Sequence, residues 1–123
     1  MKEFIISQIS KGKYNEKGSR FIAVAEPCQS LDSIKSKLLF NKKKHSNANH
    51  YCYAYRIKIN GIINEYTSDN NEPSGSAGIP ILNVLKRNHI VNAVIFVIRY
   101  FGGTKLGLPR LKTAYKTAAD DAI

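Results

Sequence analysis

The chain has 123 residues, of which 43% are hydrophobic and 23% are charged. This length and composition predict one folded domain covering residues 1–123 and exclude a disordered chain. No apolar run approaches the roughly 18 residues of a membrane span, and the first residues lack the basic and then apolar order of a signal peptide. We therefore expect a cytoplasmic protein with no membrane partner.

The net charge of +10 has two interpretations. A basic surface favours polyanionic partners such as RNA or the ribosome through long-range attraction. Alternatively, biased nucleotide usage raises lysine and asparagine together, and a lysine-coated surface needs no partner. A run of lysines at a helix end is also commonly just a solvated end that complements the helix dipole. Clustering of the cations favours the first interpretation, and the candidate basic patch comprises Lys42, Lys43, Lys44, Arg110, Lys112 and Lys116.

The first third of the chain predicts two strands and a helix. Residues 4–9 form a short apolar run, residues 11–19 a polar turn, and residues 20–26 a second segment of β-type residues that Pro27 ends. Ser30 is a candidate N-cap ahead of apolar residues at helical spacing. A helix is therefore expected from Ser30 to about Asn41.

A β-hairpin is predicted in the middle of the chain. Residues 51–59 alternate with the period of a strand, and Asn60-Gly61 is the strongest short hairpin signal. A two-residue turn sets the register, so Arg56 is expected opposite Glu65, and Tyr55 opposite Tyr66.

The last third predicts a helix, a buried strand and a final helix. Pro80 is tolerated only in a first turn, so its helix begins within a residue or two of Ala77. Residues 93–98 are apolar without alternation, which indicates a central strand covered on both faces. Pro109 opens the last helix. The resulting order, ββα, ββα, βα, is that of a single α+β domain.

Residues 72–78 form a glycine-rich loop that leads into the first of these helices. Free backbone N–H groups, the helix dipole and two serine hydroxyls converge there, so a phosphate or carboxylate would suit the loop. The commoner fate of such a sequence is structural, with Ser74 or Ser76 capping the helix and the glycines forming tight turns.

Residues 99–107 form a second glycine-rich loop, beyond the buried strand. Ligands commonly bind beyond a strand's carboxyl end, and Arg99 and Lys105 bring cationic donors there. The loop is not a P-loop, because Lys105 precedes Leu106 rather than Ser or Thr. Arg99 is alternatively a partner for an acid such as Glu72 or Asp69, and one arginine can do both. We expect the two loops to line one anion-binding cleft that includes Glu72, Ser74, Gly75, Ser76, Gly78, Arg99, Gly102, Gly103 and Lys105.

A secondary candidate site comprises His50, Cys52 and Asp69. The hairpin register places Cys52 near Asp69 and on the face of His50. His45 and His50 are not the i, i+4 pair of a zinc protease, and Cys52 has no activating base. A packed histidine and thiol beside a hydrogen-bonded Asp69 is therefore the favoured alternative. Cys28 and Cys52 form no CxxC pair, and we assign no catalytic residue, metal or cofactor.

Four stretches resemble the YigZ/IMPACT family: residues 17–23 (KGSRFIA), 48–56 (ANHYCYAYR), 72–78 (EPSGSAG) and 99–107 (RYFGGTKLG). The resemblance implies the fold of the family's N-terminal domain, a mixed sheet with helices packed on one face, similar to domain two of ribosomal protein S-five. Its eukaryotic members are regulators of translation that bind the co-activator of an amino-acid-starvation kinase. Its bacterial members have no settled activity, and fold alone decides none.

The chain also departs from the family pattern. An acidic run is replaced by Asp69-Asn70-Asn71, and a glycine pair by Pro109-Arg110. The family's ferredoxin-like C-terminal domain is expected to be absent, because the chain ends at Ile123. We expect a non-enzymatic binding module associated with translation, whose partner is RNA, the ribosome or a translation-regulatory protein. The alternative is a hydrolase or transferase acting on a phosphorylated or carboxylate-bearing small molecule or peptide.

Overall fold

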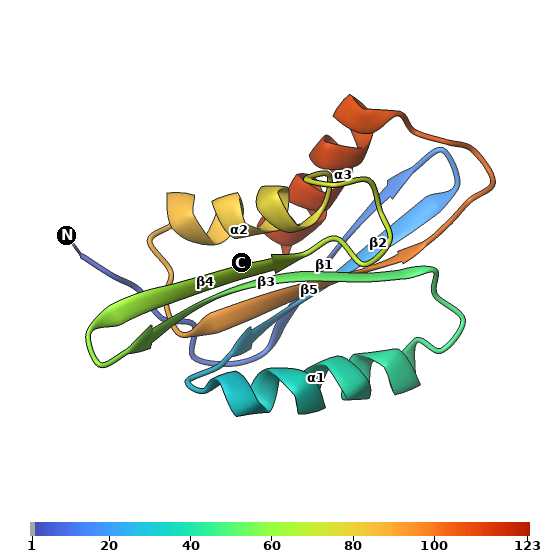
Figure 1. Cartoon of the computed structure of the whole chain (residues 1–123). Coiled ribbons are helices and arrows are strands. Elements are labelled where there is room, and N and C mark those ends of the chain that lie inside the picture. Colours follow the sequence, from blue (N-terminus) through green and yellow to red (C-terminus); the bar gives the residue numbers. More distant parts are fainter. Residues whose placement is uncertain (1) are drawn as a thin grey trace.

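A computed structural model describes residues 2–123 and confirms the α+β class (Figure 1). One sheet has the strand order β1-β2-β5-β3-β4. Its strands are β1 (Ser10–Glu16), β2 (Ser19–Pro27), β3 (His50–Ile59), β4 (Ile62–Ser68) and β5 (Ala93–Tyr100). The helices are α1 (Leu31–Lys44), α2 (Gly78–Arg87) and α3 (Leu108–Asp121).

Strand β5 lies at the centre of the sheet, as predicted. It pairs with β2 on one side and β3 on the other, and all of its residues except the last are buried. Its continuous apolar sequence therefore reflects burial on both faces. The strand ends at Arg99 and Tyr100, which brings the second glycine-rich loop to one end of the sheet.

The expectation that the helices pack on one face is wrong. Helices α2 and α3 cover one face of the sheet, and α1 covers the other (Figure 1). Ile95 and Val97 belong to the larger core, beneath α2 and α3, whereas Val94 and Phe96 pack with Ile34 of α1. Since successive side chains of β5 point to opposite faces and those of residues 93–98 are all apolar, each face needs a helical cover.

The sheet is antiparallel throughout β1–β5 rather than mixed. A parallel contact occurs as an isolated bridge between Phe4 and Ile90. The predicted strand over residues 4–9 is also wrong, because β1 occupies Ser10–Glu16, where a polar turn was expected. As an edge strand with one buried residue, Gly12, β1 has no apolar alternation to reveal it.

The other expected elements are confirmed. The hairpin register pairs Arg56 with Glu65 and Tyr55 with Tyr66, and α2 begins at Gly78. Helix α1 follows Ser30 as predicted but continues to Lys44, and the Ser30 side chain makes no capping hydrogen bond. Similarity to domain two of ribosomal protein S-five stays a prediction.

Candidate functional site

The start of α2 is occupied by the chain's own carboxylate. Asp69 accepts hydrogen bonds from the backbone N–H groups of Gly75 at 2.8 Å, Ala77 at 3.1 Å and Gly78 at 2.8 Å. Neither serine side chain caps the helix, because the N-cap is Ala77 and the buried Ser76 hydroxyl donates to the carbonyl of Pro73. The anion that the loop sequence predicts at this helix terminus is thus Asp69 itself.

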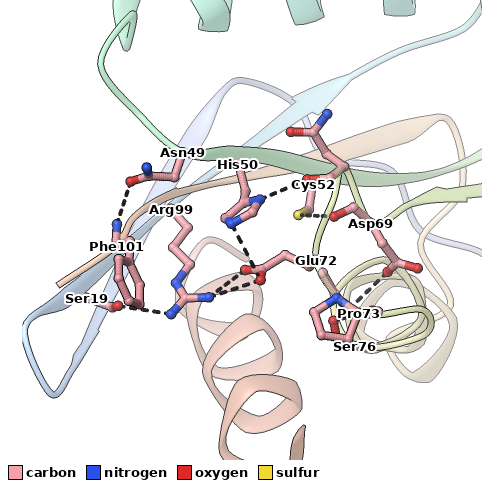
Figure 2. A network of polar contacts seen from close by, with 12 residues as sticks. Ser19, Asn49, His50, Cys52, Asp69, Glu72, Pro73, Ser76, Arg99 and Phe101 are labelled. Atoms are coloured by element: carbon pink, nitrogen blue, oxygen red, sulfur yellow. Dashed lines mark hydrogen bonds and ion pairs between the residues drawn. The ribbon is translucent and has the colours of Figure 1, made fainter. Parts of the chain in front are cut away.

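Glu72 and Arg99 form a buried ion pair next to that loop (Figure 2). Nη1 of Arg99 donates to both carboxylate oxygens, at 3.0 and 2.8 Å, and the side chains are only 5% and 4% exposed. The hydroxyl of Tyr115 donates to the same carboxylate. Burial, with Cys52 and Glu72 nearby, raises the pKa of Tyr115, so it remains a donor. The alternative role considered for Arg99, as the partner of an acid, is confirmed for Glu72.

The rest of the Arg99 guanidinium is held by residues of β2 and the second loop. Nη2 donates to the hydroxyl of Ser19 at 3.2 Å, and the guanidinium lies 5.3 and 5.4 Å from the ring centres of Phe21 and Phe101. Nε is buried and has no hydrogen-bond partner among residues 2–123. Glu72, β2 and the second loop therefore all hold this cation, which lies near two aromatic rings.

The start of β3 is tied to the same network (Figure 2). Nδ1 of His50 lies 2.9 Å from the carbonyl of Asn70, and Nε2 lies 3.6 Å from Glu72. The amide oxygen of Asn49 accepts the backbone N–H of Phe101 at 2.8 Å. These contacts hold the two glycine-rich loops at one end of the sheet.

Cys52 lies next to Asp69, as the hairpin register predicts, and is fully buried. Its thiol donates to the Asp69 carbonyl at 3.1 Å and to the hydroxyl of Tyr115 at 3.4 Å. Burial raises the pKa of this thiol to about 12. A thiol that stays protonated is a poor nucleophile, which agrees with the packing role favoured for Cys52 from the sequence.

A cleft of about 500 Å³ opens beside the network. It brings together Glu72, Arg99 and Lys105 of the predicted cleft with His50 of the secondary candidate site, and it adds Asn49 as polar lining. The remaining lining residues form apolar walls and the rim at the start of α3: Pro73, Phe101, Leu106, Gly107, Leu108 and Leu111. The cleft thus involves only the first two residues of the 72–78 loop, but residues from both ends of the 99–107 loop.

The other predicted cleft residues lie outside this lining. Ser76 and Gly78 are buried at the start of α2, and Gly75 faces a separate groove beside α3. Gly102 packs on the backbone of Gly18, where an added Cβ would lie 2.1 Å from a carbonyl carbon. Its glycine serves a close backbone approach. Ser74 and Gly103 are exposed and do not line the cleft.

The predicted basic patch divides between two places. Lys42, Lys43 and Lys44 end α1, whereas Arg110, Lys112 and Lys116 are exposed on α3. The fold adds Lys11 of β1 and Arg20 of β2 to the first group. We define the basic end as Lys11, Arg20, Lys42, Lys43 and Lys44.

Lys11 of β1 and Lys44 of α1 lie close enough for one charge to perturb the other. The proximity of Lys11 lowers the pKa of Lys44. Burial lowers the pKa of His45, and the positive charges of Lys44, Lys11 and Arg20 lower it further. None of the five cations that define the basic end forms an ion pair with a carboxylate of residues 2–123. The basic end is therefore an uncompensated concentration of positive charge.

Several site residues had no role assigned from the sequence. Ser19 and Asn49 lie within the stretches that resemble the YigZ/IMPACT family, and that resemblance was the signal available for them. Tyr115 of α3 packs its ring in the larger core, while its hydroxyl reaches Glu72. Within residues 2–123, no group of three or more His, Cys, Asp or Glu side chains is arranged to hold a metal ion. None of the helices described is long and apolar enough to span a membrane.

Residues 17–123 match the Impact N-terminal domain. The chain belongs to the IMPACT family. The IMPACT family member YvyE of Bacillus subtilis is 38% identical over 105 residues, which is 85% of this chain and 48% of the relative. YigZ of Escherichia coli is 30% identical over 87% of this chain and 53% of its own length. The Protein IMPACT homolog of Saccharomyces cerevisiae is 29% identical over 88% of this chain and 43% of its own length.

Solved structures agree with the IMPACT assignment. A crystal structure of a hypothetical protein superposes with a TM-score of 0.90 at 28% identity, covering 96% of this chain and 58% of the other. The two-domain translational regulator Yih1 superposes with a TM-score of 0.56 at 27% identity, covering 94% of this chain and 46% of Yih1. The chain spans about half the length of the curated relatives. The IMPACT match includes every residue of the cleft and leaves β1 outside.

Proposed function

We propose that this IMPACT domain is a cytoplasmic binding module of translation control that contacts RNA, including ribosomal RNA, through its basic end. Two findings support a role in translation control: the family includes Protein IMPACT homologs, and one structural neighbour is described as a translational regulator. The charge supports contact with RNA, because each nucleotide of RNA carries a negative phosphate that a basic surface attracts.

The uncompensated charge at the basic end carries the proposal. Like charges held together by a fold repel one another, and a polyanion relieves that repulsion on binding. Lys11 comes from β1 and Arg20 from β2, whereas Lys42 to Lys44 come from α1. Tertiary structure therefore concentrates cations that sequence clustering alone would not place together.

A salt titration tests this proposal. Labelled single-stranded RNA should bind weakly and with little sequence preference, and log affinity should fall with log salt by about 0.7 per phosphate contact. Replacing Lys42, Lys43 and Lys44 with glutamine should flatten this slope without changing sequence preference. Replacing Arg110, Lys112 and Lys116 removes the same charge from α3 and should flatten it less. The proposal fails if the wild-type domain binds no RNA at low salt or binds independently of salt.

A small-molecule role of the cleft is a second candidate, favoured by the lining itself. The ligand proposed has an anionic group, because exposed Lys105 and half-buried His50 are among the polar lining residues, and an apolar part, because three leucines also line the cleft. An enzyme of this kind, a hydrolase or transferase, would lose transition-state stabilisation when a cationic donor is removed.

Turnover measurements separate the two candidates. A binding module should turn over neither phosphoesters nor dipeptides. Lys105→Ala is the suitable variant, because this exposed side chain can be removed without disturbing the buried pair. If the wild type turns over a substrate and Lys105→Ala abolishes that turnover, the domain is an enzyme rather than a binding module. Lys112→Ala, an exposed lysine on α3, is the matched control and should leave any turnover unchanged.

A further inference from the structure

Four tyrosines line the α1 face of the β3–β4 hairpin. Tyr51, Tyr53 and Tyr55 alternate along β3, and Tyr66 of β4 lies opposite Tyr55. The ring centres of Tyr55 and Tyr66 are 5.7 Å apart with an interplanar angle of 25°, and Tyr53 lies 6.0 Å from Tyr66. We call these four residues the tyrosine row.

The outer part of the tyrosine row is open to solvent. Helix α1 covers the sheet beneath β3 and β5, where Ile57 and Phe96 are buried, but no residue of β4 is buried. Tyr66 is 50% exposed on this edge strand. A groove of about 230 Å³ runs between α1 and the row, lined by Leu31, Ile34, Lys35, Leu38, Tyr53, Tyr55 and Tyr66.

Cations accompany the tyrosine row along its length. Lys35 lines the groove beside Tyr55 and Tyr66, and Nζ of Lys42 lies 5.8 Å from the ring centre of Tyr51. No acidic residue lines the groove. Because Lys42 also belongs to the basic end, the tyrosine row adjoins that charged surface.

We infer that the tyrosine row is a stacking platform for single-stranded RNA. Bases would extend the Tyr55–Tyr66 stack at its exposed edge, and Lys35 and Lys42 would contact phosphates. Aromatic rings beside cations suit unpaired bases, because every base has a π-face, whereas a duplex hides those faces in its own stack. From Tyr51 to Tyr55 the strand spans about 13 Å, which accommodates a short single-stranded segment. This inference rests on the proposed function, to which it adds the strand state of the RNA and a second contact surface.

Substitutions of Tyr66 test the inference in the same RNA titration. Tyr66→Ala should weaken binding of a labelled ten-nucleotide single strand roughly 5- to 150-fold, the loss expected for one stacked base. The salt slope should be unchanged, because no charge is removed. Tyr66→Phe should retain wild-type affinity, since the ring stays. Phe40→Ala removes an aromatic side chain that is 64% exposed on α1 outside the row, and it should have no effect.

The outcomes distinguish this inference from the proposed function. Circular dichroism establishes that each variant is folded, and Tyr66→Leu, which keeps apolar packing without a ring, should bind as weakly as Tyr66→Ala. Salt-dependent binding by the wild type with undiminished binding by Tyr66→Leu would overturn the stacking platform alone. Absence of RNA binding by the wild type would overturn both. A dimer in sedimentation that Tyr66→Ala dissociates would assign the row to self-association and also overturn the platform.

Discussion

Replacing Glu72 with alanine is expected to lower the free energy of unfolding by about 3–5 kcal/mol, the usual cost of breaking a buried ion pair. The substitution leaves the Arg99 charge buried without its carboxylate and removes the acceptor of the Tyr115 hydroxyl. A loss of this size is a large part of the roughly 5–15 kcal/mol that stabilises a typical domain. Urea denaturation followed by circular dichroism measures it.

A second arginine–glutamate pair provides the control. Arg56 and Glu65 are also 2.8 Å apart, but Glu65 is 32% exposed, so Glu65→Ala should cost about 0–1 kcal/mol. Equal losses for Glu72→Ala and Glu65→Ala would show that burial does not control the strength of these pairs. Combining Glu72→Ala with Arg99→Met should recover part of the loss, because no buried charge is then left unpaired.

Asp69→Ala is expected to cost about 2 kcal/mol or more, at the upper end of the range for losing a helix cap. One carboxylate satisfies three backbone N–H groups, those of Gly75, Ala77 and Gly78, and lies at the positive end of the α2 dipole. Its removal leaves these donors unpaired in a part-buried loop. Thermal and urea unfolding both report the loss.

Asp32→Ala is the matched control, because Asp32 is an exposed acid in the first turn of α1 that makes only a dipole interaction. It should cost about 0.3–1 kcal/mol. The loss of stability for Asp69→Asn should lie between the losses for Asp69→Ala and Asp32→Ala, since asparagine keeps an oxygen acceptor but loses the charge. If Asp69→Ala were as mild as Asp32→Ala, water or the loop itself would have to satisfy the α2 N-terminus.

Strong local signals made parts of the fold predictable. Asn60-Gly61 specifies a two-residue turn, and the turn sets the pairing of Arg56 with Glu65 across the hairpin. Pro80 restricts the start of α2 because it lacks an N–H, and the apolar run of β5 reports burial on two faces. Each of these signals acts through the backbone within a few residues. The family resemblance was equally accessible, since its long stretches are contiguous in the chain.

Longer-range features were not predictable from local patterns. Strand β1 was missed because an edge strand with an exposed face needs few apolar residues. The position of α1 was wrong because periodicity says which side of a helix is apolar, not which face of the sheet that side covers. The choice depends on how the chain crosses the sheet.

The sequence by itself determined the family, the class of fold and the residues of the two glycine-rich loops. Only the tertiary structure decided what those loops do. It places Asp69 on the N–H groups where an external anion was expected, and it pairs Arg99 with Glu72 over 27 positions of sequence. It also brings Lys11 beside Lys44. Arg99 and Glu72, like Lys11 and Lys44, are too far apart in sequence to leave a periodic or local signature. Electrostatic energies depend on distance and burial, which exist only once the chain is folded.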